Sequence, residues 1–310
     1  MSTPAIAPEL DYGIPAPGYR LPAETRLGRV RLQVSDLGRS ITYYEQVLGL
    51  RVIEQHGDVA VLGAYGHDRP VVELHERKGA RPVPRRGRLG LYHFAILLPN
   101  RAALGRFLAH LEETGAYAGM SDHFVSEAIY LTDPDGLGIE VYADRPRAAW
   151  RHEGRQLVMT TVPLDERSLL LAATASGRPD DVTWTGLPAG TVIGHVHLYV
   201  ADLDAAAAFY HAGLGFDKTV WNYPGALFLS AGGYHHHLGT NTWAAGAARA
   251  EPDDARLLEW EVVVPAAGDG EAAARSLTMA GASVTRDGDD WLAADPWGTM
   301  VRLVARHPAA

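Results

Sequence analysis

The chain has 310 residues, with 28 lysines and arginines against 37 aspartates and glutamates, which gives a formal net charge of -9. This acidic balance argues against a general nucleic-acid-binding surface, because contact with phosphates requires a basic one. The sequence contains no cysteine, so disulfides, thiolate metal ligands and a cysteine nucleophile are excluded. Any metal site must therefore use histidines and carboxylates.

Residues 1–25 are proline-rich and lack periodicity, which indicates an N-terminal tail that packs against the body or stays mobile. They do not show the basic-then-apolar order of a signal peptide, and no apolar run approaches the roughly 20 residues of a membrane span. We therefore expect a soluble, cytoplasmic protein.

The first half of the chain, residues 26–146, contains two modules with the same order of predicted elements. Module one, at about 27–80, begins with alternating apolar residues, followed by a short helix whose first N–H groups Asp36 can cap. Module two, at about 88–145, begins with an apolar strand at 91–99 and continues through a helical stretch. It ends with an Asp-Pro-Asp-Gly turn at 133–136 and a last strand.

Residues 147–190 form a connector with a helix-like stretch at 165–173, and the second half, 191–310, repeats the first. Module three lies at about 192–245, where Asp202 takes the capping position, and module four lies at about 256–306. The offsets between matching strands agree: 195 − 29 = 166, 259 − 93 = 166 and 302 − 140 = 162. The chain is therefore an internal duplication, and we predict an α+β fold of four β-α-β-β-β modules.

Histidines concentrate in modules two and three. Module two has His93 on its first strand and His123 in a loop, with Glu140 on its last strand. Module three has histidines at positions 195 and 197 of its first strand and a run at 235–237 near its last strand. A histidine on an apolar strand is by default a hydrogen-bonded core residue, but the coincidence of these with Glu140 favours a site.

These motifs make the chain resemble an extradiol ring-cleaving dioxygenase of the catechol 2,3-dioxygenase kind, in the vicinal oxygen chelate, or glyoxalase-fold, superfamily. The resemblance covers nearly everything after the first 25 or so residues. It rests on GLYHFAI at 90–96, DHFVSEAIYLTDPDGLGIEVY at 122–142, GHVH at 194–197 and GGYHHHLGTNTW at 232–243. It implies two cup-shaped mixed β-sheets with flanking helices.

The family binds one Fe(II) through two histidines and one glutamate, which implies His93, Glu140 and His195 as the metal ligands here. Two imidazoles and one carboxylate leave three adjacent positions on an octahedral ion, which suits enzymes that bind substrate and O2 together. The same ligands suit Mn(II), which stays the alternative to Fe(II).

Modules one and four indicate how the four modules pair. At the positions that correspond to the expected ligands, module four has Glu259 and Arg302 and module one has Arg29. Arginine is unsuited to these positions, because a guanidinium repels a cation. Pairing modules two and three unites the three expected ligands, and it leaves the other three residues for an ion cluster. Whether these two modules meet within one chain or between two chains stays open.

The chemistry also needs a proton acceptor and donor, and imidazole serves both roles near neutral pH. His236 is our candidate, because module symmetry is expected to give it the place on the last strand that Glu140 holds in module two. The resemblance adds His123 and Tyr130 as further catalytic residues. Candidates for contact with substrate or O2 are His197, His235, His237 and Asn241, and Trp243 is a guess for the pocket wall.

The expected function is extradiol (meta) cleavage of a catechol-type substrate by O2 to a 2-hydroxymuconic semialdehyde-type product, as in aromatic hydrocarbon catabolism. One alternative is a glyoxalase- or epimerase-like enzyme that uses its metal without O2, and another is a non-catalytic binding or resistance protein of this fold. The expected partners are the catechol and O2, with neither nucleic acid nor membrane. A homo-oligomer and the ring substituents stay open, since no charged clamp stands out.

Overall fold

The computed structural model describes residues 12–116, 118–174 and 184–306. Module one consists of β1 (Arg26–Val34), α1 (Leu37–Gln46), β2 (Arg51–His56), β3 (Val59–Gly63) and β4 (Pro70–Glu76). Module two consists of β5 (Gly90–Leu97), α2 (Arg101–Thr114), β6 (Gly119–Asp122), β7 (Ser126–Thr132) and β8 (Gly138–Asp144). The segment after it contains η1 (Arg147–Ala149), β9 (His152–Glu153), β10 (Gln156–Leu157) and α3 (Glu166–Ala173).

Module three consists of β11 (Val192–Tyr199), α4 (Leu203–Ala206) with a π-helical continuation (Ala207–Gly213), β12 (Asp217–Val220), β13 (Ala226–Ser230) and β14 (Leu238–Asn241). Module four consists of β15 (Arg256–Val264), α5 (Ala267–Met279), β16 (Val284–Asp287), β17 (Asp290–Ala294) and β18 (Met300–Ala305). The predicted α+β fold of four β-α-β-β-β modules is confirmed. The predicted helix caps are confirmed too, since Asp36 and Asp202 accept hydrogen bonds from the third backbone N–H after them.

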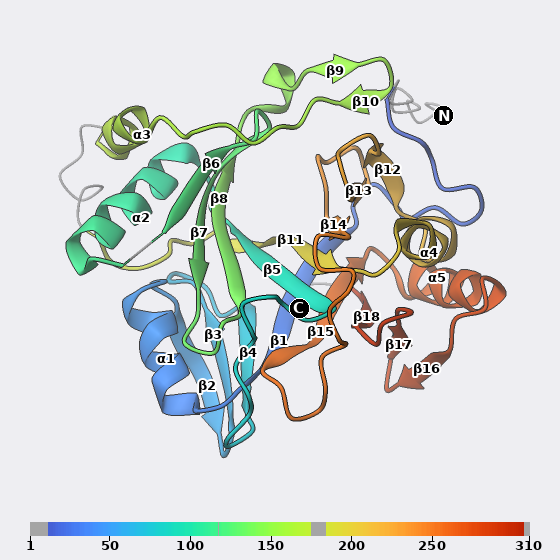
Figure 1. Cartoon of the computed structure of the whole chain (residues 1–310), viewed down its shortest axis with the longest axis horizontal. Coiled ribbons are helices and arrows are strands. Elements are labelled where there is room, and N and C mark those ends of the chain that lie inside the picture. Colours follow the sequence, from blue (N-terminus) through green and yellow to red (C-terminus); the bar gives the residue numbers. More distant parts are fainter. Residues whose placement is uncertain (1–11, 117, 175–183, 307–310) are drawn as a thin grey trace, which may run out of the picture.

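The strands of the four modules form two eight-stranded sheets, with helices on their outer sides, and β9 pairs with β10 in a separate two-stranded sheet (Figure 1). The first sheet has the order β16-β17-β18-β15-β1-β4-β3-β2 and unites modules one and four. The second sheet has the order β12-β13-β14-β11-β5-β8-β7-β6 and unites modules three and two. Modules two and three therefore share one sheet within a single chain, through antiparallel pairing of β5 with β11.

Apolar residues alternate along the central strands and build one large core cluster. Phe94 on β5, Val196 on β11 and Trp260 on β15 are fully buried in it. Because neighbouring residues of a strand point to opposite faces, the residues before them face away from this core. The alternation therefore presents a second, more polar face on each sheet.

Two tyrosine–aspartate contacts tie the modules together. The Tyr44 hydroxyl donates to Asp133 Oδ2 at 3.3 Å, and the Tyr210 hydroxyl donates to Asp295 Oδ2 at 2.9 Å. Each aspartate begins an Asp-Pro-x-Gly turn, in which its Oδ1 accepts two backbone N–H groups. The helix of module one is thus bonded to module two, and the helix of module three to module four.

The N-terminal segment packs along module three from Tyr12 onwards. The Tyr12 hydroxyl donates to the Gly233 carbonyl at 2.6 Å, Arg20 pairs with Asp217 at 2.6 Å, and Leu21 is buried. The first eleven residues lie outside the described part. Among the described helices, none is long and apolar enough to cross a membrane.

Candidate functional site

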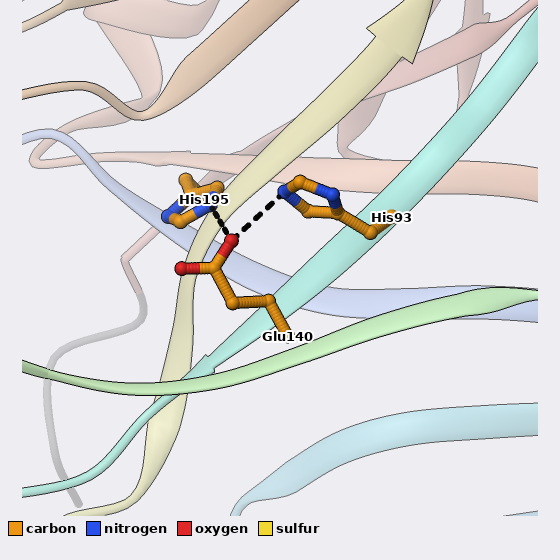
Figure 2. A group of neighbouring side chains, drawn as sticks. All are labelled: His93, Glu140 and His195. Carbon is orange, nitrogen blue, oxygen red and sulfur yellow. Dashed lines mark hydrogen bonds and ion pairs between the residues drawn. The ribbon is translucent and has the colours of Figure 1, made fainter. Parts of the chain in front are cut away.

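Three buried side chains of the second sheet converge on one point (Figure 2). Nε2 of His93 lies 3.0 Å and Nε2 of His195 lies 3.2 Å from the same carboxylate oxygen, Oε2 of Glu140. One potential ligand atom from each of the three lies within 4.8 Å of the others. The structure thus brings together the three ligands that the resemblance implied.

Strand register explains this convergence. Parallel pairing of β5 and β8 sets Glu140 opposite Ala95, two residues after His93, and antiparallel pairing of β5 and β11 sets His195 opposite Ala95 as well. The register of β11 shifts at Gly194, the first residue of the GHVH motif. A side chain on Gly194 would overlap the Tyr142 hydroxyl, so only glycine fits here.

The electrostatics of the three residues suit a cation. Burial lowers the pKa of His195 to about 4, so its imidazole is neutral and free to coordinate at neutral pH. Burial alone would raise the pKa of Glu140, but its interactions with His195 and His93 hold that pKa well below the usual range. Among the described residues, Nδ1 of His93 and Nδ1 of His195 are buried without a hydrogen-bond partner, and Nε2 of His93 has only the Glu140 carboxylate near it. A buried carboxylate beside unsatisfied imidazoles fits a divalent metal ion.

The three residues open onto a cavity of about 370 Å³. Its other walls are mainly aromatic or small and come from β5–β8, module three and the segment after β10. The lining residues besides the three are Tyr92, Ser121, His123, Tyr130, Met159, Thr160, Thr161, His197, Tyr223, Phe228, His236 and Trp243. This volume and this lining suit a small aromatic ligand.

Tyr130 and His123 form a hydrogen-bonded pair on one wall. Nδ1 of His123 lies 2.6 Å from the Thr160 carbonyl oxygen, to which it must donate, so Nε2 accepts from the Tyr130 hydroxyl at 2.5 Å. Burial raises the pKa of Tyr130 well above its usual value, which keeps the phenol protonated. Phe124, the residue after His123, has a φ of 68°. Such values are uncommon outside glycine, and residues held in them cluster at functional sites.

His236 lines the cavity beside His195, with ring centroids 4.1 Å apart. It does not, however, occupy the symmetry position predicted for it. In module two, Glu140 lies opposite Ala95, two residues after His93. In module three, the residue two after His195 is His197, and it lies opposite Gly239. The symmetry-related position thus holds Gly239, where an added Cβ would lie 2.9 Å from Cγ of His197. His236 precedes β14, and the loop before that strand brings it to the cavity.

The other candidates divide between the cavity wall and the layer behind it. His197 lines the cavity, and its Nε2 accepts a hydrogen bond from the Asn241 side-chain amide at 3.0 Å. Asn241, His235 and His237 are buried but do not belong to the described lining. His237 instead contacts Ser230 and the Ala231 N–H through Nδ1. These three support the wall rather than form it.

Sequence reasoning missed several lining residues, and the guess about Trp243 agrees with the lining. Met159, Thr160 and Thr161 lie in the predicted connector, where they carry no pattern that indicates a site. A backbone bridge between Asp122 and Val162 holds this segment over the cavity.

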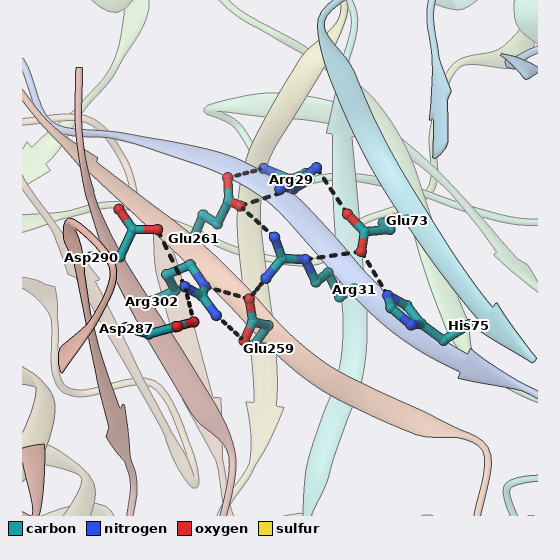
Figure 3. Close-up of polar contacts among 9 residues, drawn as sticks. All are labelled: Arg29, Arg31, Glu73, His75, Glu259, Glu261, Asp287, Asp290 and Arg302. Carbon is teal, nitrogen blue, oxygen red and sulfur yellow. Dashed lines mark hydrogen bonds and ion pairs between the residues drawn. The ribbon is translucent and has the colours of Figure 1, made fainter. Parts of the chain in front are cut away.

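The equivalent positions of the first sheet hold an ion network instead (Figure 3). Arg302 pairs with Glu259 at 2.6 Å, as the predicted cluster requires, but Arg29 reaches Glu73 and Glu261 and has no ion pair with Glu259 among the described residues. Arg31 joins the two parts by contacting Glu73, Glu259 and Glu261. By register, Glu73 stands where Glu140 stands in the second sheet.

Glu73 gives this network a testable pH dependence. Burial alone would raise its pKa, but His75, Arg29 and Arg31 lower that pKa to about 2. A lowered carboxylate pKa stabilises the fold above the unfolded value near 4.5, and this stabilisation is lost as the pH falls towards 2. We expect Glu73→Gln to lower the free energy of unfolding at pH 7 and to flatten its decline between about pH 4.5 and 2, as denaturant titrations would measure. Parallel declines in both proteins would contradict the assignment.

The comparisons agree with this geometry. The sequence matches the family model described as Glyoxalase/Bleomycin resistance protein/Dioxygenase superfamily over residues 26–141 and 192–301. It is 44% identical over 277 residues to a catechol-2,3-dioxygenase of Bacillus subtilis (strain 168), covering 88% of this chain and 94% of that one.

Two solved structures show the same fold at low identity. A Bacillus subtilis subsp. subtilis str. 168 protein superposes with a TM-score of 0.63 at 16% identity, covering 94% of this chain and 87% of that one. Glyoxalase I from Zea mays superposes with a TM-score of 0.54 at 18% identity, covering 91% and 92%.

Proposed function

Since the chain belongs to the glyoxalase/bleomycin resistance protein/dioxygenase superfamily, we propose that it is an Fe(II)-dependent extradiol dioxygenase. Its substrates are a catechol and O2, and its product is a 2-hydroxymuconic semialdehyde-type compound. The observation that carries the proposal is the buried group of His93, Glu140 and His195 at the wall of an aromatic cavity. The 44% identity with a protein named catechol-2,3-dioxygenase supports the same reaction.

His93, Glu140 and His195 would hold the metal. A bound ferrous ion would supply adjacent coordination sites for both catechol oxygens and for O2, and it would carry electrons from the ring to O2. The protein contributes a fixed ligand geometry, because each ligand stands on a central strand of one sheet. It also shields the ligand residues from bulk water, since each of the three residues is at most 5% exposed.

The protein's own residues then handle the protons. Burial lowers the pKa of His236 well below its usual value, so its imidazole is neutral and can accept a proton from a catechol hydroxyl. On the same cavity, the Tyr130 hydroxyl donates its proton to His123, so its oxygen can accept a hydrogen bond from a substrate hydroxyl. The imidazole of His236, once protonated, can return that proton, so it can serve as both the acceptor and the donor that ring opening requires.

The cavity wall also restricts the charge of the substrate. Its described lining contains neither arginine nor lysine, and its only carboxylate, Glu140, is a proposed metal ligand. An anionic ring substituent would therefore find no arginine or lysine on the described wall to pair with. We therefore expect catechol and 4-methylcatechol to show kcat/KM values at least about 10-fold above that of 3,4-dihydroxybenzoate, as steady-state O2 uptake would measure. Equal values for the three would contradict this account of the wall.

The proposed reaction is tested by loading the protein with Fe(II) without oxygen and then adding catechol and air. The expected result is uptake of one O2 per catechol, with both oxygen atoms in a yellow product. Metal-dependent conversion of another substrate without O2 uptake would instead indicate a glyoxalase-like enzyme. Catechol binding without turnover would indicate a binding protein.

A further inference from the structure

A line of hydrogen bonds leads from the cavity wall to the end of β8. Nδ1 of His236 lies 2.8 Å from Nδ1 of His235, and Nε2 of His235 lies 2.8 Å from Oδ1 of Asp144. His235 is fully buried, whereas the Asp144 side chain is 28% exposed. The line joins module three to module two across 91 residues of sequence, and it forms because the two modules share a sheet.

The partners along this line determine where the ring protons lie. A carboxylate can only accept, so the Nε2 of His235 that faces Asp144 must carry a proton. With its one ring proton on Nε2, His235 has an accepting Nδ1, to which His236 donates from its own Nδ1. The lone pair of His236 is consequently on Nε2, the nitrogen that does not contact His235, and the residue lines the cavity.

We propose that Asp144 is a positioning residue that acts through His235 to hold His236 in the tautomer with an unprotonated Nε2 towards the cavity. This inference rests on the proposed function, in which His236 accepts the proton of a catechol hydroxyl. The proton moves from the substrate oxygen to Nε2, and no other bond changes in this step. The opposite tautomer would present an N–H to the substrate and could not accept that proton.

Asp144 has a second donor, which lies outside the line from Asp144 to His236. The Tyr234 hydroxyl donates to the same Oδ1 at 3.1 Å, and a Tyr142–Tyr234 contact of 2.6 Å lies behind it. The Tyr234 ring also packs on His235, with centroids 4.0 Å apart. Tyr234→Phe is therefore a matched control, because it removes one donor from Asp144 but leaves the line from Asp144 to His236.

The first test is the kinetics of Asp144→Asn. The new amide can donate to His235 Nε2, which reverses every hydrogen bond along the line and places a proton on His236 Nε2. We expect kcat to fall by about 10²-fold or more, with the catechol KM and the Fe(II) content within about threefold of wild type. Tyr234→Phe should lower kcat by less than about threefold, and Asp144→Glu should restore part of the loss. A wild-type kcat in Asp144→Asn would overturn the proposal.

The second test does not depend on activity. Long-range ¹H–¹⁵N spectra of histidine-labelled protein carrying Zn(II) distinguish the two tautomers, and His236→Gln identifies the signal by its loss. We expect the wild-type His236 ring to carry its proton on Nδ1 and the Asp144→Asn ring to carry it on Nε2. A proton on Nε2 in the wild type would overturn the proposal even if Asp144→Asn fails to fold. If the wild-type protein cleaves no catechol, the proposed function falls, whereas these spectra still decide the role of Asp144.

Discussion

Glu140→Gln is expected to weaken Fe(II) binding by at least about 10²-fold and to abolish ring cleavage. The substitution keeps the size of the side chain but removes the negative charge of the proposed metal site. Mutation of a residue that only hydrogen-bonds to a metal ligand already lowers metal affinity about 10–100-fold, so we expect loss of a ligand itself to lower it by more. Metal analysis after anaerobic loading and isothermal titration with Fe(II) measure the effect.

Glu73→Gln is the matched control, because Glu73 occupies the same register position in the other sheet. Its partners are arginines and a histidine rather than the site residues, so iron binding should stay at the wild-type level. Thermal unfolding of both variants checks that each is folded. Retention of iron by Glu140→Gln, or equal loss from both variants, would refute the placement of the metal in the second sheet.

His236→Gln is expected to lower kcat by about 10²–10⁴-fold while iron binding stays near the wild-type level. Glutamine retains hydrogen-bonding capacity but cannot accept a proton from catechol near neutral pH. Because His236 is not one of the three converging residues, the metal should remain bound. Single-turnover measurements with Fe(II)-loaded protein and catechol separate this loss from an effect on substrate binding.

His110→Gln provides the control for the loss of a buried histidine. His110 is 8% exposed against 6% for His236, and it contacts the Gln46 carbonyl and stacks on Trp184, away from the cavity. This variant should lose some stability and keep its kcat. A kcat for His236→Gln within about threefold of wild type would remove His236 from the proposed mechanism.

Much of the architecture follows from patterns within the amino-acid sequence. The repeat offsets predicted four modules, and polar residues on apolar strands marked the positions that converge in each sheet. Arg29, Glu259 and Arg302 indicated that module two pairs with module three, and the strand orders confirm that one sheet unites modules two and three and the other unites modules one and four. The faces of the strands were predictable because strand periodicity is local: the spacing along a strand decides which face a side chain takes.

Other features depended on contacts between distant segments. Module symmetry assigned the position equivalent to Glu140 to His236, but register gives it to Gly239, because a loop can change the alignment of a repeat without a visible change in pattern. The connector residues 159–161 gave no sign that they cover the cavity. The contact between Asp144 and His235 was equally hidden, since nothing local relates two residues in different modules.

The amino-acid sequence by itself determined the duplicated modules, through their repeat offsets, and the faces of their strands, through local periodicity, while its resemblance to a known family implied the three residues proposed to bind metal. Only the tertiary structure decided which loops close the cavity, how the arginines and glutamates of the first sheet connect, and which carboxylate orients His236. Those features arise where segments far apart in the chain meet, and their geometry is set by sheet register and packing rather than by local sequence.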